Sequence, residues 1–369
     1  MRRIIFLQSK LPDDVRALRQ IADRWNYYGE SIQKYDNQAR IWVVTPRPLN
    51  ATAKEILLSK FVGQVSSVEL NKSILSRINA LRRQIKAEKM RLTLVCGDNQ
   101  QSLLFALALK FSVKSLVRIQ IQFHGDTYSF SSNKGLQGFL RVCLSRLGIM
   151  TADSIRIVSR FQAEEIRQIS KSAGDKFVLA PVPIDFLRVA TSSERIRFDV
   201  AFIGRFHSER GISDLIKILK LLKSQRPSTT VVLVGEGPLK NEIGRELISW
   251  LTDSTISMPG FLSGDEVLEI YGSSRVLIST APREGYGLTL REAALSNVHV
   301  IARESKGSLE AQDSFPSRIE VFSNIVEAVR LIQRQLEEQI LNKPKCDFAS
   351  QLKTDIEGLD RLTKSWVKL

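Results

Sequence analysis

Short apolar runs alternate with helical patterns along the chain, and this alternation constrains the fold more than any other feature. In the first half we interpret six runs as buried strands, namely RIIFL, RIWVV, LTLVC, RIQIQF, SIRIV and FVLAP. The helical patterns between them cover 12–25, 72–89, 100–110, 136–148 and 161–171. Strands that are apolar throughout, rather than at every second residue, are typical of a parallel sheet with helices on both faces.

The alternation breaks once and then restarts. Residues 180–198, APVPIDFLRVATSSERIRF, combine two prolines with a polar Ser/Thr run, a composition typical of a linker. After it, the strands DVAFIG, TTVVLVG, RVLIST and VHVIA alternate with helical patterns again, at 212–223, 238–251, 288–296 and 324–339. We therefore predict two doubly wound, Rossmann-like α/β domains that face each other across a cleft. Their predicted bounds are 1–185 and 198–346, with a linker at 186–197 and a C-terminal helix at about 347–369 that packs back on the first domain.

The remaining composition indicates a cytoplasmic protein. The chain has 369 residues, a length that suits two domains, and three cysteines, Cys96, Cys143 and Cys346. Their odd number and wide separation favour reduced thiols rather than disulfides or a metal site. The N-terminal MRRIIFLQSK resembles a first strand more than a signal peptide, and no apolar run approaches the roughly 18 residues that cross a bilayer.

Two strand ends in the second half carry residues that suit phosphate binding. In FIGRFHSERG, Gly204 permits a tight turn, and Arg205 and Arg210 would hold a diphosphate through charge-assisted hydrogen bonds. In GEGP, Gly235 and Gly237 turn the chain and would border a nucleobase. Each motif alone is equally consistent with solvated arginines or with an ordinary strand-to-helix turn.

A third loop, APREGYGLTLREAALSN (281–297), places two carboxylates around a helix start. Gly285 and Gly287 let the backbone approach a ligand, and the helix N-terminus offers free N–H groups to an anion. Glu284 in the loop and Glu292 on the helix would accept hydrogen bonds from vicinal hydroxyls. A ribose, a diphosphate and a hexose in sequence would match this arrangement, whereas the alternative is two surface acids beside a turn.

Taken together, the motifs resemble glycosyltransferase family 4. FIGRFHSERG, GEGP, MPGFLSGDEVLEIY and EGYGLTLREA occur in that family's order and spacing. Its members are retaining enzymes of the two-Rossmann-domain (GT-B) architecture, with Glu-x7-Glu as signature. The similarity covers the second domain, and FHGD (123–126), ADSIRIVSRFQAEEI (152–166) and APVPID (180–185) extend it more weakly into the first.

The resemblance implies a role for each matching residue of the second domain. Arg205 and Arg210 would bind the donor diphosphate, and Glu284 would hold hydroxyls of the donor sugar. Glu292 would hold the nucleotide ribose, and Glu236 would lie near the base. The backbone that completes the donor site would belong to Gly204, Gly285, Tyr286, Gly287 and Leu288.

In the first domain, the resemblance implies that His124 reaches the donor sugar or the leaving phosphate and that Asp126 lies toward the acceptor. The chain departs from the family in three places. The loop after the first strand, LQSKLPDDVRAL, has no glycine, and LSNVHVIA has Asn297 where the family has glycine. Residues 306–308, KGS, replace a glycine pair near the base.

The function that the resemblance implies is retaining sugar transfer from a nucleoside-diphosphate sugar to a hydroxyl of a glycan or lipid-linked acceptor, in cell-surface polysaccharide or glycolipid synthesis. The sequence has no Asp-x-Asp pair and no cluster with metal-ligand spacing, so we expect no metal cofactor. The alternatives are a sugar-nucleotide epimerase or phosphorylase of the same architecture and, from charge alone, a nucleic-acid-binding protein. Nucleic acid is disfavoured because no reading motif accompanies the basic residues. Base, sugar, acceptor, linkage and oligomeric state stay open.

The net charge of +15 favours anionic partners, and part of it lies on the predicted helix at 72–89. Its apolar face consists of Ile74, Ile78, Leu81 and Ile85. Its basic face consists of Lys72, Arg77, Arg82, Arg83, Lys86 and Lys89. A basic amphipathic helix would suit an anionic membrane surface at the inner membrane face. The alternative is an ordinary domain helix whose apolar face lies in the core.

Overall fold

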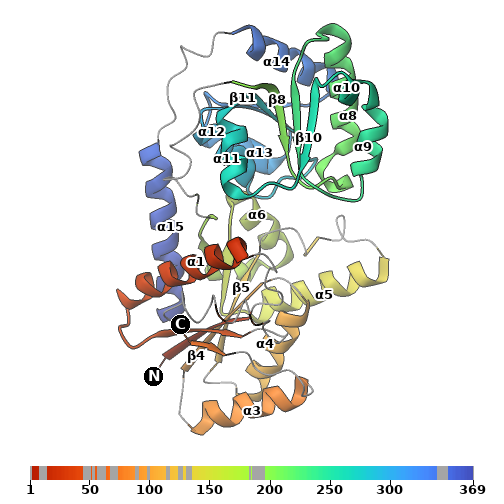
Figure 1. Cartoon of the computed structure of the whole chain (residues 1–369). Helices are drawn as coiled ribbons and strands as arrows, with labels where there is room; N and C mark the ends of the chain where they lie inside the picture. Colours follow the sequence, from red (N-terminus) through yellow and green to blue (C-terminus); the bar gives the residue numbers. More distant parts are fainter. Residues whose placement is uncertain are drawn as a thin grey trace. The chain divides into compact units, whose positions relative to one another are not determined.

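The structure is a computed structural model of the chain, and it divides into two compact units (Figure 1). The first unit comprises Met1–Pro181 and Asp355–Leu369, and the second comprises Val182–Thr354. The residues that the structure describes are 2–7, 15–44, 51, 55, 64–66, 74–87, 91–97, 100–113, 117–123, 128–129, 135–182, 184, 196–338 and 348–368.

The first unit is built on a seven-stranded parallel sheet of order β3-β2-β1-β4-β5-β6-β7. Its strands are β1 (Arg2–Leu7), β2 (Arg40–Val44), β3 (Gln64–Ser66), β4 (Arg91–Gly97), β5 (Val117–Gln122), β6 (Ser154–Ile157) and β7 (Phe177–Leu179). Its helices are α1 (Val15–Gln33), α3 (Ile74–Ala87), α4 (Gln100–Ser112), α5 (Gly135–Thr151), α6 (Arg160–Ile169) and, from Asp355 onward, α15 (Phe348–Lys368), with a 3-10 helix at Lys171–Lys176. The chain starts in the middle of the sheet and fills one side before the other, as in doubly wound folds.

Helix α15 packs on the first unit through a buried tryptophan. The ring of Trp366 makes edge contacts with Phe6 and Tyr28, at centroid distances of 5.2 and 5.4 Å. Its indole N–H donates to the side-chain oxygen of Gln120, and its carbonyl oxygen accepts the hydroxyl of Thr93 at 2.8 Å. Because the indole N–H is satisfied, a large aromatic side chain is buried there without losing a hydrogen bond.

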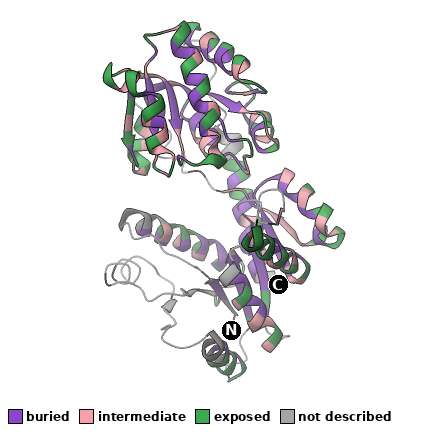
Figure 2. Ribbon diagram, turned by 90° about the vertical axis from the view of Figure 1, so that its right-hand side faces the viewer, coloured by how far each residue is buried: buried purple, intermediate pink, exposed green. Residues whose placement is uncertain are grey.

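The second unit is built on a six-stranded parallel sheet of order β10-β9-β8-β11-β12-β13. Its strands are β8 (Phe198–Ile203), β9 (Val231–Val234), β10 (Ile256–Gly260), β11 (Ser274–Ser279), β12 (His299–Arg303) and β13 (Ile319–Phe322). Its helices are α8 (Ile212–Gln225), α9 (Lys240–Glu246), α10 (Ile248–Thr252), α11 (Gly264–Gly272), α12 (Leu288–Leu295), α13 (Lys306–Ser314) and α14 (Ile325–Glu337), and a 3-10 turn spans Ser208–Arg210. Figure 2 shows buried strands between helices whose outer sides are exposed.

Two parallel sheets flanked by helices confirm the predicted fold class of two doubly wound α/β units. Some elements differ from the expectation. The single helix expected at 238–251 is two helices, α9 and α10, which meet at the buried Leu247. Strands β10 and β13 were not expected, because one contains Pro259 and the other is only four residues long.

The helix expected at 72–89 is α3, and its apolar face lies in the core. Ile78, Leu81 and Ile85 are buried in the cluster that underlies the first sheet, whereas Arg82 and Lys86 are exposed. Of the two alternatives, the structure shows the ordinary domain helix, because these apolar side chains are not available to lipid. None of the helices in the described part of the chain is long and apolar enough to span a bilayer.

Candidate functional site

The second sheet has its switch point between β8 and β11. These strands are neighbours in the sheet, yet the chain leaves β8 toward β9 and β10, and leaves β11 toward β12 and β13. At such a point the two loops that follow the strands diverge and leave a crevice at their carboxyl ends, where open α/β sheets bind ligands. The loops here are 204–211 and 280–287, the segments that the sequence marked for phosphate and sugar.

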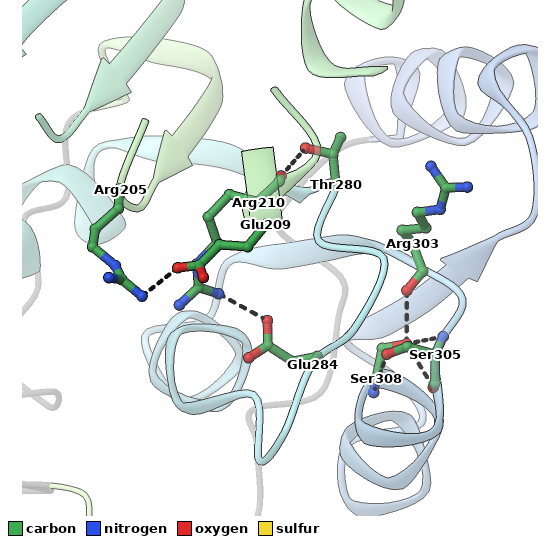
Figure 3. A network of polar contacts seen from close by, with 8 residues as sticks. All are labelled: Arg205, Glu209, Arg210, Thr280, Glu284, Arg303, Ser305 and Ser308. Atoms are coloured by element: carbon green, nitrogen blue, oxygen red, sulfur yellow. Dashed lines mark hydrogen bonds and ion pairs between the residues drawn. The ribbon is translucent and has the colours of Figure 1, made fainter. Parts of the chain in front are cut away.

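Close backbone contact fixes the two loops to each other. Gly211 has φ +66°, and a Cβ at this position would lie 2.0 Å from the carbonyl oxygen of Thr280. The hydroxyl of Thr280 donates to the carbonyl oxygen of Arg210 at 2.8 Å (Figure 3). A glycine is therefore required at 211, both for its left-handed backbone and for the space that the second loop occupies.

Arg210 and Glu284 form an ion pair across these loops. Nη1 of Arg210 lies 3.2 Å from Oε2 of Glu284, and the side chains are 32% and 14% exposed (Figure 3). Burial raises the pKa of Glu284, and Arg210 and the backbone N–H groups of Gly287 and Gly285 oppose that rise. Nε of Arg210 is buried and has no hydrogen-bond partner in the described part of the chain. Because the side chain is still partly exposed and a guanidinium has five N–H groups, Arg210 keeps further donors for an anion.

Arg205 lies apart from that pair. Its side chain is 71% exposed and forms an ion pair with Glu209, one helical turn further along the chain (Figure 3). Glu209 was not among the expected site residues, although its spacing from Arg205 is that of a local pair. An exposed pair of this kind contributes little to stability, so an anionic ligand could displace Glu209 at small cost.

Glu292 lies in the second turn of α12, the helix that begins after Gly287 in the left-handed region, at φ +70°. The hydroxyl of Tyr271 donates to Oε2 of Glu292 at 3.2 Å. Burial raises the pKa of Glu292 to about 7, although the bond from Tyr271 lowers it. Tyr271, on α11, is buried and was not singled out from the sequence, which shows it only as the last residue of the MPGFLSGDEVLEIY motif.

Two expected donor residues have side-chain partners within the second unit. The ring of Tyr286 is buried beneath Arg291, whose Cζ lies 4.3 Å from the ring centroid and whose Nε donates to the Tyr286 carbonyl oxygen at 3.0 Å. Glu236 is exposed and pairs with Lys240 at 2.6 Å. The backbone of Tyr286 stays in the loop beside Glu284, whereas its side chain supports α12.

The GEGP turn packs directly on the loop after β8. Gly235 has φ +144°, and a Cβ there would lie 2.0 Å from the carbonyl oxygen of Gly204. At Gly237, with φ +158°, a Cβ would lie 2.4 Å from the carbonyl oxygen of Phe206. Both glycines are therefore needed for backbone-to-backbone packing, and they hold the Arg205 loop in place.

Helix α13 approaches the Glu284 loop from the other side. A Cβ on Gly307 would lie 2.0 Å from the carbonyl oxygen of Glu284. The side chain of Ser305 caps the helix by accepting the N–H of Ser308 at 3.2 Å (Figure 3). The KGS segment departs from the family pattern, but its Gly307 allows α13 to approach the Glu284 backbone more closely than any other residue would.

The residues expected from the first domain, His124 and Asp126, lie outside the described residues. The same holds for most of the expected linker, since residues 185–195 are not described. Among the residues that are described, no three His, Cys, Asp or Glu side chains are grouped so that they could hold a metal ion.

Comparison with known proteins finds a family match within the second unit. Residues 185–346 match the family described as glycosyl transferases group 1. The uncharacterized glycosyltransferase YqgM of Bacillus subtilis is 26% identical over 205 residues, which cover 54% of this chain and 55% of that protein. The gpi3 subunit of phosphatidylinositol N-acetylglucosaminyltransferase from Schizosaccharomyces pombe is 24% identical over 119 residues, 32% of this chain and 26% of the subunit. The alignments thus span about half of one relative and a quarter of the other.

Among solved structures, HepE of Anabaena in complex with UDP and glucose is similar over both units. The TM-score is 0.65 at 15% identity, and the match covers 99% of this chain and 95% of HepE. A likeness at this identity shows the fold, which is that of GT-B glycosyltransferases. Together with the family match, it supports a glycosyltransferase.

Proposed function

We propose that this protein is a retaining glycosyltransferase of family 4 that moves a sugar from a nucleoside-diphosphate sugar to a hydroxyl of a glycan or lipid-linked acceptor. The second unit binds the donor and the first unit binds the acceptor. The observation that carries the proposal is the Arg210–Glu284 pair at the switch point of the second sheet, with the partly buried Glu292 on the helix that follows.

The donor would extend along these groups in the order of its own parts. The diphosphate would take the N–H groups of Arg210 that remain beside its ion pair with Glu284, and the N–H groups at the start of α12, because both favour negative charge. The sugar hydroxyls would donate to Glu284, and the ribose hydroxyls to Glu292, where Tyr271 occupies only one carboxylate oxygen. Glu236 would lie near the base, and its ion pair with Lys240 would be replaced by a contact with the ligand.

The same residues would stabilise the leaving diphosphate. As the glycosidic bond breaks, negative charge grows on the phosphate oxygens, and Arg210 meets that charge in a fixed position. Arg205 would join it by leaving Glu209. Glu284 is paired with Arg210, and Glu292 accepts a hydrogen bond from Tyr271, so neither carboxylate is available as a nucleophile. We therefore infer that the acceptor hydroxyl attacks the sugar on the face from which the diphosphate departs. In that route the leaving phosphate accepts the proton of the acceptor hydroxyl, and no metal is required.

The relatives support the donor and acceptor classes. HepE is solved in complex with UDP and glucose, which makes UDP the first base to test. The gpi3 relative is named for a phosphatidylinositol substrate, and Acholeplasma laidlawii alpha-monoglucosyldiacylglycerol synthase is 26% identical over 106 residues. We accordingly place the reaction in glycolipid or surface-polysaccharide synthesis.

Products formed from a nucleotide sugar without added acceptor would test the reaction class. A transferase hydrolyses its donor slowly, so NMR should show free sugar and nucleoside diphosphate, with the sugar released first as the anomer of the donor. An epimerised nucleotide sugar, or sugar 1-phosphate formed with added phosphate, would instead favour the epimerase or phosphorylase. Tight binding to duplex DNA without any nucleotide-sugar binding would refute the enzyme altogether.

A further inference from the structure

The outer face of α5 is apolar along its whole length. Its exposed side chains include Leu136, Phe139, Leu140, Leu147 and Met150, which are 76%, 51%, 50%, 42% and 66% exposed. At 100° per residue these positions fall on one stripe, opposite the buried residues Val142, Ser145 and Ile149. A helix that packs in a core on one side ordinarily carries polar side chains on the other, so this outer stripe is not needed for the fold.

Helix α4 extends the apolar surface. It packs beside α5 (Figure 1), and a Cβ on Gly148 of α5 would lie 3.0 Å from the side chain of Leu103. Leu104 and Phe111 are 51% and 63% exposed and are one position beyond Leu103 and Lys110, which both face α5. At 100° per residue the two share one face of α4, away from its buried residues Ala106 and Leu109. An apolar surface this large on a water-exposed unit is typical of an interaction site.

The part of the sequence that contains α3, α4 and α5 is strongly basic. Residues 71–151 contain thirteen Lys and Arg but three Asp and Glu, which gives +10 of the chain's net charge of +15. Neither α4 nor α5 contains an acidic residue, and Arg141 on α5 is exposed. Helix α3, which packs against α4, adds Arg82, Arg83 and Lys86, all exposed.

We propose that the outer face of α5, with the exposed apolar face of α4, docks on an anionic lipid bilayer. The apolar side chains enter the boundary between headgroups and acyl chains, and the basic residues around them attract the lipid phosphates. A second copy of the chain is disfavoured as the occupant, because two surfaces of the same sign would repel. This membrane contact is independent of sugar transfer. In it, α3 contributes positive charge and does not insert into the bilayer.

Co-sedimentation of the full chain with vesicles tests this proposal. Vesicles of phosphatidylcholine and phosphatidylglycerol in equal parts should bind the protein, and pure phosphatidylcholine should bind it far less. Changing Leu136, Leu140 and Leu147 to Gln keeps helix propensity and should lower partitioning about tenfold or more, because each leucine loses apolar burial. The matched control changes three equally exposed residues elsewhere, Ile248, Leu352 and Ile356, to Gln and should change partitioning less than about twofold.

A second variant separates charge from burial. Changing Arg82, Arg83 and Lys86 to Gln should weaken binding at low salt only, because added salt already screens those charges. Wild-type partitioning of the α5 variant, or no binding of the wild type to anionic vesicles, would overturn the proposal. So would a wild-type dimer in analytical ultracentrifugation that the α5 variant converts to a monomer. Circular dichroism should show the α5 variant folded, since all three side chains are exposed.

Discussion

Replacing Glu292 by glutamine should stabilise the second unit above pH 7 and weaken its binding of a nucleotide sugar. The carboxyl is partly buried and bonded to Tyr271 of α11, and its pKa rises from the ordinary 4.5 to about 7 because burial disfavours the ionised form. Glutamine carries no charge at any pH, and its amide oxygen can still accept the hydrogen bond from Tyr271. The substitution therefore removes the cost of burying the charge while keeping the local hydrogen bond.

The magnitude follows from the two pKa values. Between pH 4.5 and about 7 the unfolded chain holds fewer protons at this carboxyl than the folded unit does, so stability falls as pH rises through that window. Above pH 7 the loss is complete. At about 1.4 kcal/mol for each pH unit, the wild-type residue costs at most about 3 kcal/mol there. Glu292→Gln should recover most of this cost at pH 8 and almost none at pH 4.5.

Hydrogen exchange measured by mass spectrometry would check the prediction within the second unit alone. Peptides from β11 and α12, corrected for the intrinsic exchange rate, report the free energy of opening of this region. Glu304→Gln is the matched control, because Glu304 is exposed, and it should leave exchange unchanged. Equal or faster exchange of Glu292→Gln at pH 8 would show that the carboxylate is not destabilising, and the reasoning from burial would fail.

Three further predictions concern the donor site. Arg210→Ala should slow transfer by about 10²-fold or more, and Arg205→Ala should slow it too. Because both arginines act on one diphosphate, the double variant should lose less activity than the product of the two single losses. Steady-state kinetics at saturating donor measures all three rates. Activity should survive EDTA, and loss that only manganese or magnesium restores would contradict metal-free catalysis. Gly307→Ala should weaken nucleotide-sugar binding measured by calorimetry, because its Cβ would lie 2.0 Å from the Glu284 carbonyl oxygen. The control Gly244→Ala should bind like the wild type, because a Cβ at Gly244 would have no atom within 4 Å.

The fold and the position of the Arg210 and Glu284 loops at the carboxyl ends of strands could be predicted from sequence for one physical reason. Continuously apolar strands indicate a parallel sheet, and the carboxyl ends of parallel strands lie at one edge. Loops that follow adjacent strands β8 and β11 must then come together there, whatever their sequence. Short strands such as β13 were missed because four residues carry too little pattern to be separated from a loop.

Side-chain partners could not be predicted in the same way. Arg205 with Glu209 and Glu236 with Lys240 are local pairs, and each competes with the ligand role that the sequence indicated. Tyr271 meets Glu292 only because α11 and α12 pack on the same sheet, a contact that no local spacing encodes. On α5 the helix was expected, but both of its sides are apolar, so the sequence did not show which side faces water.

Calorimetric titration of a nucleotide-sugar panel, beginning with UDP-glucose, tests the central claim most directly. We expect at least one nucleoside-diphosphate sugar to bind at one site per chain. Its affinity should fall about tenfold or more in both Arg210→Ala and Glu292→Gln, since each loses a charged hydrogen-bond partner of the ligand. Absence of binding across the panel, or equal affinity in the wild type and both variants, would contradict a donor site at the switch point of the second sheet.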